Sequence, residues 1–366
     1  MKFMKYCKHL FKTLYFQKDS ENSAKLSVCC VAKMSEEKSL INFDDEFLKN
    51  QRTFFLETGN LPPACEVCDS LENKTGQSFR TSNTENTVIQ DTNPILETLQ
   101  YNCDNICNLK CVVCSSYFSS SWIEDEKKLG IERLVKIEKM KPTKHNKLIL
   151  DLDFSNLETV YFNGGEPLMS RDHINLMNHL KLNFDTSKIS LSYSTNGTFF
   201  VSDEVIELWK SFQSVNLMFS LDAVEKAFEY VRYPASWDLV TTNIKKFHDL
   251  NLPQLVLRIQ ANIGLHNILY LDDIHAWVKQ NNYACNSPTL TIGGLEIFNF
   301  PFEYKNKLLN HVENYSNFDG KENIINSIKN INSGNKYDWK DYFEKLDSIR
   351  NVNWKESLSK LNEFIK

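Results

Sequence analysis

The run ETLQYNCDNICNLKCVVCSSYF, residues 97–118, joins a short β-type segment to a loop with three closely spaced cysteines. Residues 97–102 are predicted to form the first of a series of strands that alternate with helix-type runs. The other strand candidates are residues 158–163, 190–195, 215–222, 255–262 and 289–298. This alternation predicts parallel β-α units in an α/β fold, arranged as an open doubly wound sheet or as a barrel. Six units would make a partial (β/α)6 barrel of the TIM type.

Apolar stripes indicate the helices of this series. After the third strand candidate, Ser202 is predicted to cap a helix. Its apolar residues recur at i, i+3, i+4 and i+7, which places them on one helix face. They are Val205, Leu208, Trp209 and Phe212.

Composition and charge narrow the class of protein. The chain has 366 residues, with 47 acidic and 42 basic side chains and a net charge of −5. At about 150 residues per domain this length predicts two or three domains. This net charge shows no excess of basic residues of the kind that binds nucleic acid. We expect no membrane span, because no apolar run reaches about 18 residues. Lysines also interrupt the first residues, so we expect no signal peptide and a cytoplasmic location.

The ten cysteines fall in clusters. In a reducing cytosol, clustered thiols are more often metal ligands or catalytic groups than disulfides. Between the two main clusters, the polar run TSNTENTVIQDTN at residues 81–93 lacks helical periodicity, which predicts a linker and a boundary near residue 92. We therefore expect three parts: a small N-terminal domain at 1–92, the strand-rich barrel at 93–302, and a helical extension at 303–366.

The spacing Cys107-x3-Cys111-x2-Cys114 suits an iron–sulfur cluster. Three thiolates hold one face of a cluster, while a cube of four irons needs four ligands, so one iron would be left open. An open position is typical of catalytic metal sites. Two other interpretations remain: the thiols pack on one face of a helix, or Cys103 is the fourth ligand of a closed zinc or electron-transfer cluster.

Polar groups follow the next strand candidates where each strand ends. Gly164 and Gly165 would let a ligand approach the backbone closely, and the Glu166 carboxylate would accept hydrogen bonds from an ammonium group. The alternative is a plain strand-to-helix turn. Ser194 and Asn196 end the third strand and Ser220 and Asp222 end the fourth. Barrels of β-α units place their active sites at these strand ends.

The fifth strand candidate offers one further charged group. Arg258 and Gln260 alternate with Leu257 and Ile259, so the two polar side chains are predicted to face the barrel interior. A structural ion pair within the barrel is the alternative role for Arg258.

A second metal site is indicated near the N-terminus. Cys65-x2-Cys68 has the spacing of a metal knuckle, and Cys7 with Cys29 or Cys30 would complete four ligands. By chemistry alone, zinc and iron–sulfur are comparable occupants.

These motifs together resemble the radical S-adenosylmethionine (radical SAM) superfamily. The matching segments are CNLKCVVC at 107–114, FNGGEP at 162–167, STNG at 194–197 and FSLDA at 219–223. Residues 228–247, FEYVRYPASWDLVTTNIKKF, further resemble the branch that carries an extra cluster domain of the SPASM or twitch type. The resemblance spans about residues 7 to 305.

The resemblance implies a [4Fe-4S] cluster on Cys107, Cys111 and Cys114, whose open iron binds the amino and carboxylate groups of SAM. Reductive cleavage of SAM would then give a 5′-deoxyadenosyl radical that abstracts hydrogen from a substrate. The SAM-contacting residues implied by the family motifs are Val113 against adenine, Gly164, Gly165 and Glu166 at the amino group, Ser194 and Asn196 by the ribose and carboxylate, and Ser220 and Asp222 beside the same pocket. Arg258 is expected to meet the SAM carboxylate.

For the N-terminal cysteines the resemblance implies a second, auxiliary [4Fe-4S] cluster. Its expected ligands are Cys7, Cys29, Cys65 and Cys68, with Cys30 as the alternative to Cys29. In the family this module more commonly follows the barrel, whereas here it precedes it. Four cysteine ligands would close the cluster, which favours electron relay or a structural role.

We therefore expect a radical SAM enzyme that acts on a peptide or a small molecule and takes electrons from a donor such as flavodoxin or ferredoxin. A rival hypothesis is a non-catalytic iron–sulfur electron carrier. A third is a zinc-binding interaction module, which the net charge of −5 does not favour as a nucleic-acid binder.

Overall fold

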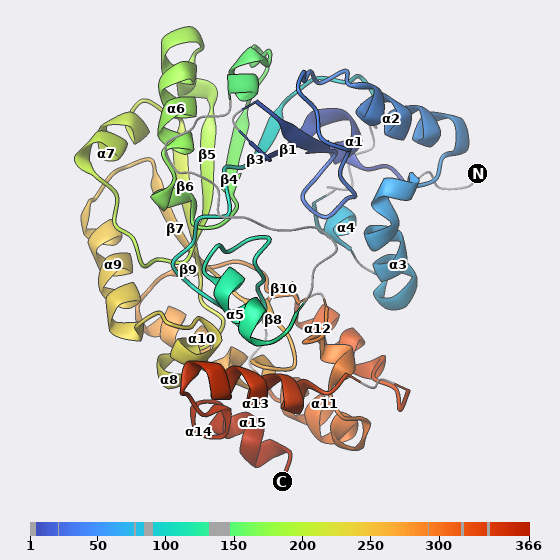
Figure 1. Ribbon diagram of the computed structural model, residues 1–366, viewed down its shortest axis with the longest axis vertical. Helices are drawn as coiled ribbons and strands as arrows, with labels where there is room; N and C mark the ends of the chain where they lie inside the picture. The colour runs from blue at the N-terminus through green and yellow to red at the C-terminus, as the bar shows by residue number, and fades with distance from the viewer. Residues whose placement is uncertain are drawn as a thin grey trace.

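The computed structural model describes residues 5–20, 22–76, 78–83, 91–131, 147–291, 293–315, 318–334 and 337–366. Its centre is an eight-stranded sheet with helices packed along its outer face (Figure 1). In spatial order the strands are β2 (Ala24–Ser27), β1 (Thr13–Lys18), β3 (Thr98–Asn102), β4 (Thr159–Asn163), β5 (Ser190–Thr195), β6 (Ser214–Ser220), β7 (Leu255–Gln260) and β9 (Ala284–Cys285). All neighbours are parallel except β1 and β2. The predicted α/β class is confirmed.

The first five predicted strands are present as β3 to β7, with bounds that differ from the prediction by at most two residues. The sixth prediction, residues 289–298, is wrong. Among its described residues, that stretch holds only the strand β10 (Thr289–Leu290), which pairs with β8 (Asn262–Ile263) in a separate two-stranded sheet, and the main sheet ends on β9 instead. The reason is local: Gly293 has a φ of 104°, far from strand geometry, and the chain then turns into the 3-10 helix Ile297–Asn299.

The N-terminal residues contribute to this same sheet. β1 pairs in parallel with β3, from Thr13 beside Thr98 to Gln17 beside Asn102. Helices α1 (Lys8–Lys12), α2 (Glu46–Thr58), α3 (Glu66–Thr75) and α4 (Phe79–Asn83) gather around this end of the sheet (Figure 1). Residues 84–90 of the predicted linker lie outside the described residues. The three-part division therefore stays a prediction, although the sheet itself crosses the boundary at residue 92.

Alternation along the strands gives the sheet two unlike faces. On the helix-covered face every second residue is buried, as in Val160, Leu191 and Leu217. On the inner face the residues between them are polar and half-buried: Tyr161, Ser192 and Asn216 stand level on β4, β5 and β6. The sheet therefore presents a polar concave surface next to the carboxyl ends of its strands.

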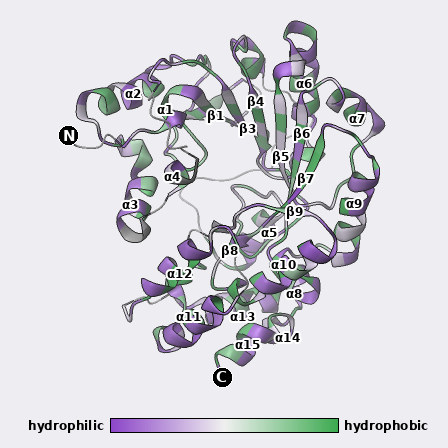
Figure 2. Cartoon of the chain, turned by 180° about the vertical axis from the view of Figure 1, so that it is seen from behind, coloured by the Kyte–Doolittle hydropathy of each residue, from purple (hydrophilic) through white to green (hydrophobic). Residues whose placement is uncertain are grey.

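The outer helices carry both hydrophilic and hydrophobic residues, drawn in purple and green (Figure 2). They are α6 (Asp172–Asn183), α7 (Asp203–Trp209), α9 (Trp237–Asp249) and α10 (Leu271–Gln280). Ser202 takes the N-cap position of α7 as predicted, but its side chain makes no capping hydrogen bond. The predicted stripe is confirmed, because Val205, Leu208, Trp209 and Phe212 are all buried.

The described residues between 303 and 366 are mainly helical and pack below the sheet (Figure 1). Their helices are α11 (Lys305–Glu313), α12 (Lys321–Lys329), α13 (Trp339–Arg350), α14 (Trp354–Ser357) and α15 (Ser359–Phe364). α13 reaches the cysteine loop directly, since the Tyr342 hydroxyl donates to Val112 O at 2.8 Å. In the part of the chain that the structure describes, no helix combines the length and the apolar character that crossing a membrane requires.

Candidate functional site

The central cysteines lie in the loop between β3 and α5 (Trp122–Lys128), at the carboxyl end of the sheet. Two backbone hydrogen bonds join this loop to the loop after β4. Gly165 N donates to Asp104 O and Glu166 N donates to Ile106 O, both at 2.8 Å. The predicted polar motif after β4 therefore lies directly beside the cysteine loop.

The two glycines of that motif are required by this close approach. A Cβ on Gly164 would lie 2.5 Å from Asn102 Oδ1 and 2.6 Å from Asp104 O, and Gly164 also has a φ of 120°. A Cβ on Gly165 would overlap the carbonyl of Ile106. The glycines thus admit the backbone of the cysteine loop, which is a different close approach from the ligand contact that the sequence predicted.

The opposite side of the cysteine loop packs against the end of α8 (Glu225–Val231). Val112 N donates to Val231 O at 2.9 Å. The Trp122 indole donates to Cys111 O at 3.0 Å. Groups of the protein itself therefore hold the loop from two sides.

The three thiols share one environment. Cys111 is buried, while Cys107 and Cys114 are half-buried. Burial raises the pKa of Cys107 to about 12, and the nearby Cys111 adds to this rise. Burial also raises the pKa of Cys111, which Arg232 opposes. Since metals bind the thiolate, loading this loop with metal must displace these protons.

Glu166 is fully enclosed and hydrogen-bonded on both oxygens. Oε1 accepts from Thr195 Oγ1 at 2.8 Å and from Leu168 N at 3.1 Å, and Oε2 accepts from Asn196 N at 2.6 Å. Burial raises its pKa to about 7, while these donors pull it down. The carboxylate therefore ties the loop after β4 to the loop after β5.

Asn196 connects the β5 loop to the cysteine loop. Its Nδ2 lies 3.7 Å from Cys107 Sγ and donates to Asn108 Oδ1 at 3.0 Å. Its Oδ1 accepts from Thr198 N at 2.9 Å. The structure thus brings this predicted site residue into contact with a sulfur of the central cysteines.

Three other predicted residues stand on the inner face of the sheet. Ser194 and Arg258 lie level with Met218 on β5, β7 and β6, and Ser220 lies level with Gln260. The Ser194 hydroxyl contacts the Tyr161 hydroxyl. The inward position predicted for Arg258 agrees with this register, while its contact with a carboxylate stays a prediction.

Asp222, at the end of the fourth predicted strand, makes its contacts with other groups of the protein. Its side chain is completely buried; Oδ1 accepts from Asn262 N at 2.8 Å, and Oδ2 pairs with Arg232 Nη2 at 2.7 Å. Its carboxylate is therefore bound to protein groups. Arg232 also turns toward Cys111.

Two further residues of the loop take distinct positions. Val113 is half-buried next to Cys114 in the sequence, and its contact with adenine stays a prediction. Cys103 is fully buried next to Asp172, Asp104 and Lys18. By alternation it shares the helix-covered face with Leu99 and Tyr101, so it points away from the inner face of the sheet.

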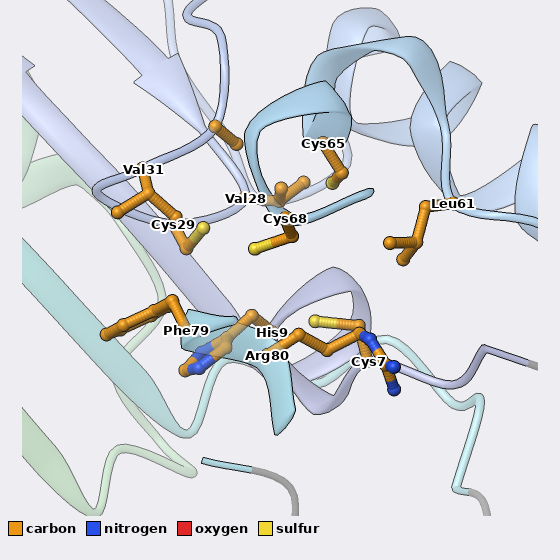
Figure 3. A pocket seen from close by; sticks show the side chains of 11 residues that line it. Cys7, His9, Val28, Cys29, Val31, Leu61, Cys65, Cys68, Phe79 and Arg80 are labelled. Carbon is orange, nitrogen blue, oxygen red and sulfur yellow. The ribbon is translucent and has the colours of Figure 1, made fainter. Parts of the chain in front are cut away.

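The N-terminal cysteines surround a cavity (Figure 3). Cys7 precedes α1, Cys29 follows β2, and Cys65 and Cys68 lie at the start of α3. All four are buried. The remaining lining residues are His9, Val28, Val31, Ala32, Leu61, Phe79 and Arg80. Within the described residues no three His, Cys, Asp or Glu side chains are arranged around a single-ion position.

The cavity distinguishes the two adjacent cysteines. Cys29 lines it, whereas Cys30 does not. The Cys30 amide donates to Gln100 Oε1 at 2.8 Å, and its thiol lies near Tyr15 and Tyr161 on the inner side of the sheet. Four buried thiols in an apolar surrounding are a donor set that suits an iron–sulfur cluster.

Some residues of both sites were missed from the sequence. Arg80 binds Glu72 through two nitrogens, at 2.9 and 2.7 Å, and donates to Tyr6 O at 2.8 Å, which fixes the chain next to Cys7. The signal available was the pair Glu72 and Arg80 close behind Cys68. Trp122 and Tyr342, which hold the central loop, carry no comparable signal in the sequence, because their partners are backbone carbonyls.

Comparisons with known proteins bear on the central loop. A family model described as "Radical SAM superfamily" matches residues 101–279. No curated protein sequence matches the chain. Among solved structures, "Native anSMEcpe with bound AdoMet" is 17% identical, covers 60% of this chain and 59% of its own, and has a TM-score of 0.40.

A second similar structure is that of Streptococcus suis SuiB bound to precursor peptide SuiA. It is 15% identical, covers 85% of this chain and 69% of its own, and has a TM-score of 0.36. The match to the anSMEcpe structure covers 59% of that protein, so the chain spans less than two thirds of its length. The family model covers the cysteine loop, Glu166 and Asn196 together with strands β4 to β7. Residues 101–279, just under half of the chain, are therefore similar to the radical SAM superfamily.

Proposed function

We propose that the protein is an enzyme that cleaves SAM reductively and abstracts hydrogen from a substrate. The observation that carries this proposal is the meeting of three elements at the carboxyl ends of β3, β4 and β5. There the cysteine loop, Glu166 and Asn196 are joined by backbone and side-chain hydrogen bonds. When bound, a [4Fe-4S] cluster and SAM supply the electron and the radical chemistry.

The chain's own residues would bind and orient these groups. Cys107, Cys111 and Cys114 provide three thiolates, which leaves one iron of a cube for SAM. Glu166 accepts three hydrogen bonds from the protein, one fewer than the about four that a carboxylate accepts, and we propose it as the acceptor for the SAM ammonium group. Arg258 and Ser194 on the inner face are proposed contacts of the same ligand.

The same set of contacts argues against the electron-carrier hypothesis. That hypothesis needs Cys103 as a fourth ligand. Cys103 instead lies on the helix-covered face beside the Lys18–Asp172 ion pair, where both charged side chains are at most 3% exposed. For Cys103 to be the fourth ligand, its buried thiol would have to move from the helix-covered face to the other face of the sheet.

A reconstitution experiment tests the proposal. The full chain is loaded anaerobically with iron and sulfide, then given a strong reductant and SAM, and 5′-deoxyadenosine is measured. Cys107→Ala is expected to abolish its formation, because a cluster ligand is lost. Cys285→Ala is the matched control, since this half-buried thiol lies on β9 away from the cysteine loop, and it should keep parental activity. Absence of 5′-deoxyadenosine from a fully loaded parent would contradict the proposal.

We further propose an auxiliary [4Fe-4S] cluster on Cys7, Cys29, Cys65 and Cys68, which would bring the total to about eight irons. The support is the shared cavity and the burial of all four thiols. A closed cluster of this kind suits electron relay or structure. A peptide or small-molecule substrate and a flavodoxin or ferredoxin donor stay predictions of the sequence resemblance.

The adjacent cysteines provide a sharp test of this second cluster. Cys29→Ala and Cys65→Ala are expected to lower the iron content by about four atoms per chain and to spare part of the 5′-deoxyadenosine formation. Cys30→Ala should retain the parental iron content, because Cys30 lies outside the cavity. Iron analysis of the three variants measures the difference. Equal iron content in Cys65→Ala and the parent would refute the second cluster. Loss of iron in Cys30→Ala but not in Cys29→Ala would make Cys30, and not Cys29, the ligand.

A further inference from the structure

Arg232 is held beside the central cysteine loop by its own backbone. The residues on either side of it accept hydrogen bonds from the loop: Val231 O from Val112 N at 2.9 Å, and Tyr233 O from Lys110 N at 2.6 Å. Cys111 lies between those two donors in the sequence. The position of Arg232 relative to Cys111 is therefore fixed by two short backbone contacts.

The guanidinium group of Arg232 bridges Cys111 and Asp222. Nη1 lies 3.9 Å from Cys111 Sγ, within the range of an N–H···S hydrogen bond, and Nη2 pairs with Asp222 Oδ2 at 2.7 Å. The Arg232 side chain is only 13% exposed and that of Asp222 is 0% exposed. Solvent therefore screens this cation weakly, and its charge acts strongly on the neighbouring sulfur.

The pair with Asp222 leaves part of the guanidinium unused. Arg232 Nε is buried and has no hydrogen-bond partner among the described residues. Nη1 of the same group faces Cys111 Sγ at 3.9 Å, so part of the cation is directed at the sulfur and not at Asp222.

We propose that Arg232 is a positioning residue that raises the reduction potential of the cluster held by Cys107, Cys111 and Cys114. This inference rests on the proposed function. Hydrogen bonds to the sulfurs and nearby charge set the potential of an iron–sulfur cluster. A reduced cluster carries one more negative charge than an oxidised one, so a fixed cation stabilises the reduced form. Asp222 limits this effect and keeps the guanidinium aimed at Cys111.

The test compares charges of opposite sign at the same place. The full chain and its variants Arg232→Gln, Arg232→Lys and Asp222→Asn are reconstituted anaerobically and checked for equal iron. Reduction is then followed by electron paramagnetic resonance at stepped potentials, on the signal that Cys107→Ala lacks. Lys245→Gln removes an exposed cation on α9, and serves as the control for a remote charge.

Arg232→Gln is expected to lower the equilibrium constant for one-electron reduction about tenfold, which is a fall of about 59 mV. Asp222→Asn should shift the potential in the opposite direction, because it leaves the cation uncompensated. Arg232→Lys keeps the charge and should stay closer to the parent than Arg232→Gln. Lys245→Gln should match the parent.

A merely structural role predicts a different pattern, since loosening the loop moves both substitutions in the same direction. Equal shifts of Arg232→Gln and Asp222→Asn, or no shift in Arg232→Gln at full iron content, would overturn the inference. If Arg232→Gln binds no iron, the inference is tested by Asp222→Asn alone. An unchanged or lowered reduction potential in Asp222→Asn would then overturn the inference. A parent without any Cys107-dependent signal contradicts the proposed function itself, whereas a parental signal with unshifted variants contradicts only the role of Arg232.

Discussion

Both carboxylate oxygens of Glu166 are hydrogen-bonded to the protein itself, through Thr195, Leu168 and Asn196. The sequence predicted this residue as part of the site but only with a ligand as its partner. The structure adds a second task, because the contact with the Asn196 amide fixes the side chain that reaches Cys107. A local sequence pattern identifies such a residue by its type and position. It does not reveal hydrogen-bond donors that lie on or just after another strand.

His173 provides a test at the same scale. It is buried on α6, and its Nδ1 lies 2.7 Å from Pro167 O, just after Glu166. Burial lowers the pKa of His173 to about 4, below the ordinary value of about 6.5. The unfolded chain therefore binds more protons than the folded one between these values, so stability is lost as the pH falls from about 6.5 toward 4.

We expect His173→Gln to remove this pH dependence while keeping a side-chain N–H donor. Between pH of about 7.5 and 5.5 the parent should lose about 1.4 kcal/mol more of its free energy of unfolding than the variant, because one pKa unit corresponds to about 1.4 kcal/mol. Denaturant unfolding of both proteins at the two pH values measures the difference. The same loss in parent and variant would contradict a neutral buried His173.

At the scale of elements, the sequence predicted β3 to β7 well. In β3, β4 and β5 an apolar residue alternates with a polar one, and in β6 buried and half-buried residues alternate. Ser190–Thr195 is the clearest case, with Leu191 and Tyr193 buried and Ser192 and Ser194 half-buried. β1 escaped prediction for the opposite reason. All of its residues are buried, so no alternation marks it, and its cysteine-rich surroundings pointed to a separate metal domain.

The C-terminal helices support the central cysteine loop, although no sequence motif indicates this role. α13 contributes Arg350, whose Nε pairs with Asp125 at 2.9 Å while its guanidinium lies over the Trp122 ring at 4.7 Å. Trp122 in turn donates to Cys111 O. A helix near the end of the chain therefore stabilises the loop that carries the central cysteines. Residues more than 200 positions apart meet here, and sequence patterns over a few residues contain no record of such pairing.

The whole molecule places the two cysteine sites on one continuous sheet. The sequence predicted that both groups of cysteines are metal ligands, because the spacing of cysteines is a local property. It left Cys29 and Cys30 undecided, because neighbours in an irregular loop differ only in the side to which they point. It also predicted a boundary near residue 92, whereas β1 and β2 extend the sheet past β3.

This continuity predicts the behaviour of a shortened chain. A protein that begins at residue 93 lacks β1, so β3 becomes an edge strand along its whole length. It also lacks Lys18, which leaves Asp172 without the cation that lies 2.6 Å away. Loss of one partner from a buried ion pair typically costs about 3–5 kcal/mol, a large part of the roughly 5–15 kcal/mol that stabilises a domain. We therefore expect this chain to aggregate or to unfold without a cooperative transition.

A chain that lacks only residues 1–4 is the matched control, because it keeps β1, Lys18 and Cys7, and it should unfold like the parent. Thermal unfolding followed by circular dichroism, with size-exclusion chromatography of the soluble fraction, distinguishes the two cases. An independent N-terminal domain predicts the reverse result: a soluble chain from residue 93 that unfolds cooperatively near the parental midpoint. The sheet register makes that result incompatible with this fold, since five residues of β3 would lose their paired neighbours in β1 at once.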